Sequence, residues 1–390
     1  MNEKQAKAQQ FAAHVANIAL THRLARAQRE SKNYPSLEKD VELFWEDIWQ
    51  CYAQQDWERL IAFREALQSF FDLRGYWHYS LSLNAWVEEA AKAHEDRFNE
   101  ARWTHDHADI LNQQGDYREA EQLYQKSEHI YRSLDQPEWA LKSRHMRSMV
   151  VRAQGRTNEA RQLSQSTMDE ARQLHLEIWL AHPLYVLALL TRDQGNIQQA
   201  VIFVEESLAL LAGTDEIAMI GQCLYFLGEA ALQQKQLEKA RGYLEESLQR
   251  VQQAGIIRRE IATKRLLGEL EVASGNYSLA MQIYNEILKT FEKEQFDDKS
   301  AKAQTIFSKA ILYVHLKQPL EAIRLLEVTL AIYKEIGNVR RVIAVSLVLL
   351  RLYIRHFHWL RAGKLLIPTC KLVYTSGLLQ PRVFFGLLRR

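Results

Sequence analysis

The histidines are the residues of this 390-residue chain whose spacing most invites a test for chemistry. The stretches HDH at 105–107 and HFH at 356–358 each place two imidazoles two positions apart. Residues i and i+2 point to different sides of a helix, so neither pair could share a metal ion. The three cysteines, Cys51, Cys223 and Cys370, form no CxxC pair, which argues against a zinc cluster or a disulfide framework. We therefore expect no metal site and no cofactor.

Motifs of catalytic chemistry are absent from the sequence. Segments of the form GxxxxGK[ST], GxGxxG, GxSxG and HExxH do not occur, and each of these would be needed to position a phosphate, a nucleophile or a metal. Acidic pairs such as Glu205–Glu206 are typical of ordinary exposed helix charges. The sequence predicts no catalytic residue, and we expect a protein that binds and is not an enzyme.

Composition favours an all-α protein. Glycine (15) and proline (6) are scarce, while hydrophobic residues make up 47% and charged residues 25% of the chain. Such a chain folds readily and has few residues left for the turns of a sheet.

The N-terminus lacks a secretory signal, and the most apolar run, 342–350, is too short to span a bilayer. We therefore expect a cytoplasmic location, with attachment to a membrane surface as the alternative.

A forty-residue period organises the chain. A turn phrase at 113–120, QQGDYREA, recurs at intervals of 40 or 42 residues, which is the spacing of stacked supersecondary units. Six phrases have a small residue seven positions before the turn (Ala108, Ser148, Ala188, Gly228, Gly268 and Ala310), and seven have an alanine five positions after it. The last unit has Leu350 where the small residue is expected. The small residues lie on two helices whose backbones can approach closely, with larger apolar residues filling the seam. The turn positions are Gly75, Gly115, Gly155, Gly195, Lys235, Gly275, Lys317 and Phe357. The small residues after them run from Ala120 through Ala160, Ala200, Ala240, Ala280 and Ala322 to Ala362, and the larger residues are Leu123, Leu163, Phe203, Tyr243, Ile283, Leu325 and Leu365.

This register resembles the tetratricopeptide repeat, in its long form of about forty residues, as in kinesin light chains and the sensor arms of bacterial signal-transduction (STAND) ATPases. The resemblance covers about residues 57–370. It implies an all-α, right-handed superhelical solenoid of antiparallel helix hairpins, with about eight units and helical caps at both ends. We expect three parts: N-terminal helices with an aromatic cap (1–56), the repeat array (57–370) and a basic, hydrophobic tail (371–390).

A binding groove is expected on the first helices of the repeats, because in the family the fifth position of each unit faces the concave side. Polar and aromatic residues occupy these positions and those one or two helical turns away. A mixture of Tyr with Arg suits a peptide or protein that carries acidic groups; the alternative is a charged helix face that is merely solvated. The predicted groove residues are Arg102, His105, Lys142, His145, Arg152, His182, Tyr185, Arg192, Tyr225, Arg265 and Phe307.

The C-terminal end combines basic and apolar residues. Residues 340–390 contain ten Lys or Arg and no Asp or Glu. One interpretation is a helix pair whose Arg stems cover the repeat core. The other is a docking surface for an acidic protein, a second copy of the chain or an anionic membrane; nucleic acid is not favoured. The predicted docking residues are Arg351, Arg355, Arg361, Lys364, Lys371, Arg382, Phe384, Phe385, Arg389 and Arg390.

The leading hypothesis for function is a protein-interaction scaffold or adaptor. Two alternatives stay open. Some bacterial pheromone receptors resemble this layout of N-terminal helices followed by repeats, which would make the chain a peptide-sensing regulator. The basic apolar end would instead suit a peripheral membrane assembly factor.

Overall fold

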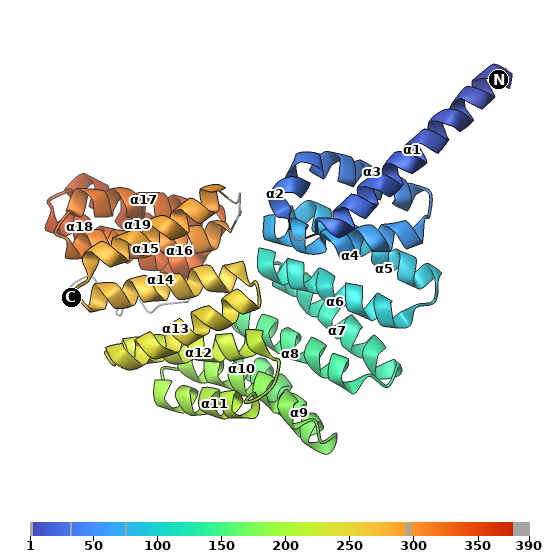
Figure 1. Cartoon of the computed structure of the whole chain (residues 1–390). Helices are drawn as coiled ribbons and strands as arrows, with labels where there is room; N and C mark the ends of the chain where they lie inside the picture. Colours follow the sequence, from blue (N-terminus) through green and yellow to red (C-terminus); the bar gives the residue numbers. More distant parts are fainter. Residues whose placement is uncertain (1–2, 32, 75, 294–297, 377–390) are drawn as a thin grey trace. The chain divides into compact units, whose positions relative to one another are not determined.

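The computed structural model describes residues 3–31, 33–74, 76–293 and 298–376, and contains only helices there (Figure 1). The chain divides into two compact units, Met1–Ala212 (unit 1) and Gly213–Arg390 (unit 2). In unit 1 the helices are α1 (Glu3–Arg29), α2 (Tyr34–Leu37), η1 (Glu38–Asp40), α3 (Val41–Ala53), α4 (Trp57–Arg74), α5 (Trp77–Ala93), α6 (Arg97–Gln114), α7 (Tyr117–Ser133), α8 (Pro137–Ala153), α9 (Thr157–Gln173), η2 (Glu177–Leu180), α10 (Ala181–Asp193) and α11 (Ile197–Leu210).

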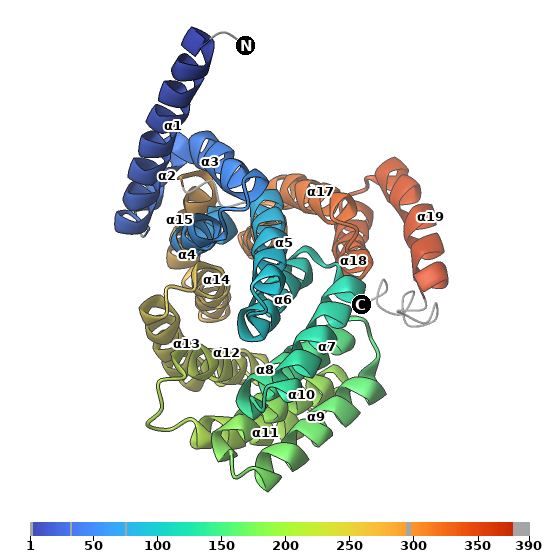
Figure 2. The same ribbon diagram turned by 90° about the vertical axis from the view of Figure 1, so that its right-hand side faces the viewer.

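Unit 2 has the same pattern of paired helices, and its last two helices, α18 and α19, are labelled toward the right of Figure 2. Its helices are α12 (Ile217–Gln233), α13 (Leu237–Gln253), α14 (Ile257–Ala273), α15 (Tyr277–Lys293), α16 (Lys299–His315), α17 (Pro319–Glu335), α18 (Val339–Arg355) and α19 (Trp359–Ser376). The prediction of an all-α array of sequential helix hairpins is therefore confirmed. Among the described residues, no helix is both long and apolar enough to cross a bilayer.

The turns predicted from Gly115 to Phe357 lie where the period places them, and the predicted turn at Gly75 lies outside the described residues. Gly115 ends α6 in the left-handed conformation, with φ of 93°, which glycine adopts without steric cost. Lys235 and Lys317 take the same region at φ of 60° and 58°. The turns between successive hairpins, for example at Glu95 and Asp135, also do so. The forty-residue period therefore contains two similar turns about twenty residues apart, and the second of them was not predicted.

Small residues let the paired helices touch. Ala108 and Ala120, on the two helices of one hairpin, are completely buried. In unit 2 a Cβ added to Gly268 would lie 2.5 Å from Cε1 of Tyr284 on the partner helix. The large, fully buried residue of the second helix is Tyr124, one position after Leu123. Leu123 is half-buried and packs against a cluster that includes Val150 of the next hairpin.

The N-terminal end of unit 1 has an aromatic core of its own. Phe44 on α3 and Phe63, Phe70 and Phe71 on α4 are completely buried in one cluster with part of α1. The first half of α1 extends beyond this cluster in both views (Figures 1 and 2). Phe11 on that half is accordingly 70% exposed.

Candidate functional site

A row of histidines crosses the first helices of three consecutive hairpins in unit 1. His105 on α6 places Nδ1 3.0 Å from Oγ of Ser143 on α8. His145, also on α8, has its ring centroid 5.0 Å from that of His182 on α10. The indole of Trp179, in η2, lies a further 5.0 Å from the His182 ring. Three of the predicted groove residues are thus brought together.

These imidazoles are neutral at pH 7. Burial lowers the pKa of His105 to about 4 and that of His182 to about 4, and the positive charge of Lys142 lowers both further. Burial likewise holds the pKa of His145 well below its ordinary value. Desolvation disfavours the charged imidazolium, so the row presents ring nitrogens and not positive charge.

Two ring nitrogens of this row have no partner. Nε2 of His105 and Nδ1 of His145 are buried and form no hydrogen bond within the described residues. His105 is only 4% exposed, so the expectation of a fully solvent-facing groove does not hold at this position. Buried polar atoms are normally paired, and an unpaired one costs about 1–3 kcal/mol. The row therefore retains hydrogen-bonding capacity that the chain itself does not use.

Lys142 is the unpaired cation beside the histidines. Its amino group lies 5.0 Å from the ring centroid of Trp139, and no acidic side chain of the described residues pairs with it. Asp109 is also nearby; burial raises its pKa to about 6, and it accepts a hydrogen bond from Tyr124. The Asp109 side chain is nonetheless 38% exposed. Lys142 is thus the group on this face that is free to bind an anion.

The other predicted residues of unit 1 already have partners. Arg102 lies 3.3 Å from Glu65, and Arg152 lies 2.7 Å from Asp193. Arg192 lies 3.5 Å from the same Asp193. Tyr185 is 5% exposed and belongs to the buried side of α10. A partner would have to displace these carboxylates in order to use Arg102 or Arg152.

The predicted residues of unit 2 form a separate polar group. Nη2 of Arg265 lies 3.3 Å from the hydroxyl of Tyr225, and Arg265 is ion-paired with Glu269. Glu269 in turn accepts a hydrogen bond of 2.6 Å from Ser308. Phe307 is half-buried against the core of α16–α19. This group is internally satisfied and leaves no free cation.

The predicted C-terminal docking residues are exposed where they are described. Arg351 and Arg355 lie on α18, and Arg361, Lys364 and Lys371 on α19. Arg361 lies 3.2 Å from Glu327. Arg382, Phe384, Phe385, Arg389 and Arg390 lie outside the described residues.

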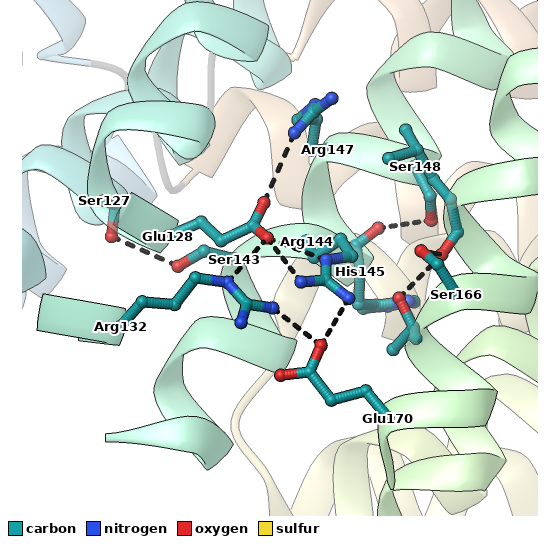
Figure 3. Close-up of polar contacts among 12 residues, drawn as sticks. Ser127, Glu128, Arg132, Ser143, Arg144, His145, Arg147, Ser148, Ser166 and Glu170 are labelled. Atoms are coloured by element: carbon teal, nitrogen blue, oxygen red, sulfur yellow. Dashed lines mark hydrogen bonds and ion pairs between the residues drawn. The ribbon is translucent and has the colours of Figure 1, made fainter. Parts of the chain in front are cut away.

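An ion network that the sequence analysis missed joins α7, α8 and α9 (Figure 3). Glu128 lies 2.7 Å from Arg144 and 3.3 Å from both Arg132 and Arg147. Glu170 lies 2.6 Å from Arg132 and 2.6 Å from Arg144. Glu128 and Arg144 are both buried. The network therefore links two successive hairpins through groups that cannot be left unpaired.

We expect Glu128→Gln to destabilise the chain by about 2–3 kcal/mol, because it removes the carboxylate that pairs with Arg147 and leaves Arg132 and Arg144 to share Glu170. The melting temperature by circular dichroism measures this. Glu159→Gln is the matched control, since the side chains of Glu159 and its partner Arg156 are 38% and 42% exposed and such surface pairs contribute little. Equal, small losses in both variants would show that the network does not hold the hairpins together.

A family model identifies the repeats. Residues 220–293 and 259–335 match a model described as tetratricopeptide repeat. Paired helices with a completely buried alanine after the turn occur before this range as well as within it, at Ala120, Ala160, Ala200, Ala240, Ala280 and Ala322. This is a tetratricopeptide repeat protein. A search of curated proteins gave no match.

Solved structures similar to this tetratricopeptide repeat protein include three regulators. The Rap conjugation gene regulator of plasmid pLS20, in complex with the Phr* peptide, is 12% identical with a TM-score of 0.59, over 73% of this chain and 77% of that one. The apo quorum sensor NprR from B. thuringiensis is 13% identical with a TM-score of 0.56, over 86% and 99%. A Rap protein complexed with Competence and Sporulation Factor is 12% identical with a TM-score of 0.56, over 82% and 99%. At these identities the likeness shows the fold alone.

The tetratricopeptide fold is a protein-binding fold, and the comparisons found no catalytic family. No group of three or more His, Cys, Asp or Glu side chains could hold a metal ion in the part of the chain that the structure describes.

Proposed function

We propose that this protein is an interaction scaffold that binds an acidic peptide or protein segment on the α6–α8–α10 face of unit 1. The observation that carries the proposal is Lys142, a cation without an acidic partner beside unpaired nitrogens of His105 and His145. A carboxylate would accept from the Lys142 ammonium, and a neighbouring polar group would satisfy the imidazoles. The protein-binding character of the fold supports this assignment.

A peptide is the form of partner that we favour. Two of the structures similar to this chain are complexes, one with the Phr* peptide and one with Competence and Sporulation Factor. Their likeness extends over 73% and 82% of this chain. We therefore propose, as the second candidate function, that binding of a peptide regulates the protein and that it acts as a sensor. A sensor should change its compactness on binding, because a ligand shifts a conformational equilibrium only by binding one state better.

The test is selection of binding peptides from a random display library, followed by calorimetry with the full chain. Lys142→Glu should weaken the selected peptides about ten- to hundredfold, since a hydrogen bond to a charged group contributes about 1.5–3 kcal/mol. Arg118→Glu is the matched control, because Arg118 is exposed on the second helix α7. Peptides bound equally by both variants, or peptides selected without acidic groups, would contradict the assignment.

A further inference from the structure

A stack of aromatic rings runs along one side of unit 1, away from the histidine row. Trp45 on α3 lies between Tyr79 and Trp86 on α5, with centroids 4.3 and 5.1 Å away. Tyr52, also on α3, stacks on the other side of Trp86 at 4.5 Å. Four rings therefore form one continuous stack between α3 and α5. Trp45, Tyr52 and Trp86 are only half-buried, so the stack reaches the surface.

Carboxylates lie at both ends of this stack. The hydroxyl of Tyr79 donates to Glu42 at 3.0 Å, and that of Tyr52 donates to Glu89 at 2.8 Å. Glu46 is exposed one turn along α3, and Trp49 beside it is 58% exposed. We call this the acidic aromatic surface: Glu42, Trp45, Glu46, Trp49, Tyr52 and Glu89.

The carboxylates of this surface remain available for a cation. In the described ranges, no ion pair involves Glu42, Glu46 or Glu89. The negative charge of Glu46 contributes to the raised pKa of Arg23, but the Arg23 guanidinium is hydrogen-bonded to Asp47 at 2.5 and 2.6 Å. Trp and Tyr faces attract Lys and Arg, and these aromatic residues dominate binding hot spots. The surface therefore suits a partner that is basic and apolar together.

The chain itself carries such a partner at its other end. In residues 340–390 there are ten Lys or Arg and no acidic residue. On α19, Lys364 and Lys371 are exposed, and so are Leu360 and Ile367, at 85% and 75%. We call α18 and α19 the basic apolar end.

A recess opens on this end between α17, α18 and α19. Its volume is ≈ 400 Å³, and it is lined by Leu330, Leu349 and Leu365, by the cations Lys334, Arg361 and Lys364, and by Glu327, which is paired with Arg361. A pocket with an apolar floor and cations nearby could take an aromatic side chain flanked by carboxylates. Two basic ends would repel each other, so a symmetric contact through this end alone is disfavoured.

We propose that the acidic aromatic surface of one chain binds the basic apolar end of a second copy. The opposite charges attract, and Trp49 supplies a large apolar side chain for the recess. A contact between two different surfaces is heterologous, so it leaves one of each surface free and copies add head to tail. This inference concerns surfaces other than the histidine row and stands independently of the proposed function.

The test uses the full chain and two variants in light scattering at low salt. One variant, Glu46→Lys with Trp49→Ser, removes the acidic aromatic surface. The other, Lys364→Glu with Ile367→Ser, removes the basic apolar end. All four positions are exposed, so the fold should be kept, and circular dichroism checks this.

Assemblies of the unmodified chain should grow beyond a dimer as its concentration rises. They should revert toward monomer when the salt is raised from 0.05 M to 0.5 M, because the electrostatic screening length then becomes roughly three times shorter. Each variant alone should be a monomer. An equimolar mixture of the two should form dimers and nothing larger, because only one intact surface of each kind is present per pair. An unmodified chain that stays monomeric, a single variant that still associates, or a mixture that stays monomeric overturns the proposal.

Discussion

Replacement of Gly268 by valine is expected to destabilise unit 2 by about 3 kcal/mol or more. Gly268 lies in α14 where the two helices of its hairpin touch, and an added Cβ would be 2.5 Å from Cε1 and 2.9 Å from Cζ of Tyr284. Tyr284 is completely buried and cannot swing away. Valine adds two more methyl groups at the same point, so α14 and α15 would have to separate. The melting temperature and the denaturant midpoint of the full chain measure the loss.

Gly242→Val provides the matched control for this substitution. Gly242 lies in α13 with no atom within 4 Å of an added Cβ. Valine there should be neutral or slightly stabilising, because glycine is the poorer helix former. If both substitutions had the same effect, the close approach of α14 and α15 would not be the reason that glycine is needed at position 268.

Acidification is expected to destabilise the chain well above the pH at which carboxylates normally protonate. His105 titrates near 6.5 in the unfolded chain but only at about 4 in the folded one. Between these values the unfolded state binds more protons, so stability falls as pH decreases from 6.5 toward 4. His105 alone should contribute a loss on the order of 2 kcal/mol at pH 5. Melting temperatures at pH 7 and pH 5 measure the effect.

Two carboxyl groups with raised pKa values oppose this loss without cancelling it. Burial raises the pKa of Asp72 and of Asp109 to about 6, so protonation below pH 6 relieves a destabilisation that both impose at neutral pH. Three further histidines, at 107, 145 and 182, have lowered pKa values and act in the same direction as His105.

His105→Gln checks the source of the pH effect, because Gln keeps a hydrogen-bonding group toward Ser143 and does not titrate. The variant should lose less melting temperature between pH 7 and pH 5 than the unmodified chain. An unchanged difference would place the acid sensitivity elsewhere.

The hairpins could be predicted because small residues recur at a fixed interval. Ala108 and Ala120 lie on either side of one turn, and only small side chains allow that contact. The period also located the turns at Lys235 and Phe357, where no glycine marks them. The predicted part boundaries at residues 56 and 370 stay predictions.

The character of the candidate site could be predicted only in part. The sequence placed His105, Lys142, His145 and His182 along the predicted groove, on the first helices of three repeats, but it could not show that the imidazoles are buried, because burial depends on the neighbouring hairpin. Likewise, Glu128, Arg144 and Glu170 read as ordinary helix charges. Their pairing depends on three helices meeting, and spacing within one helix carries no signal of it.

Hydrogen–deuterium exchange of the full chain with and without a bound peptide tests the central claim most directly. The peptide would be one selected by display and shown by calorimetry to bind. Protection should rise in α6, α8 and α10, around Lys142 and the histidine row, and stay unchanged in α7 and α9. Protection confined to the second helices, with α6, α8 and α10 unaffected, would contradict a binding face built on the first helices of unit 1.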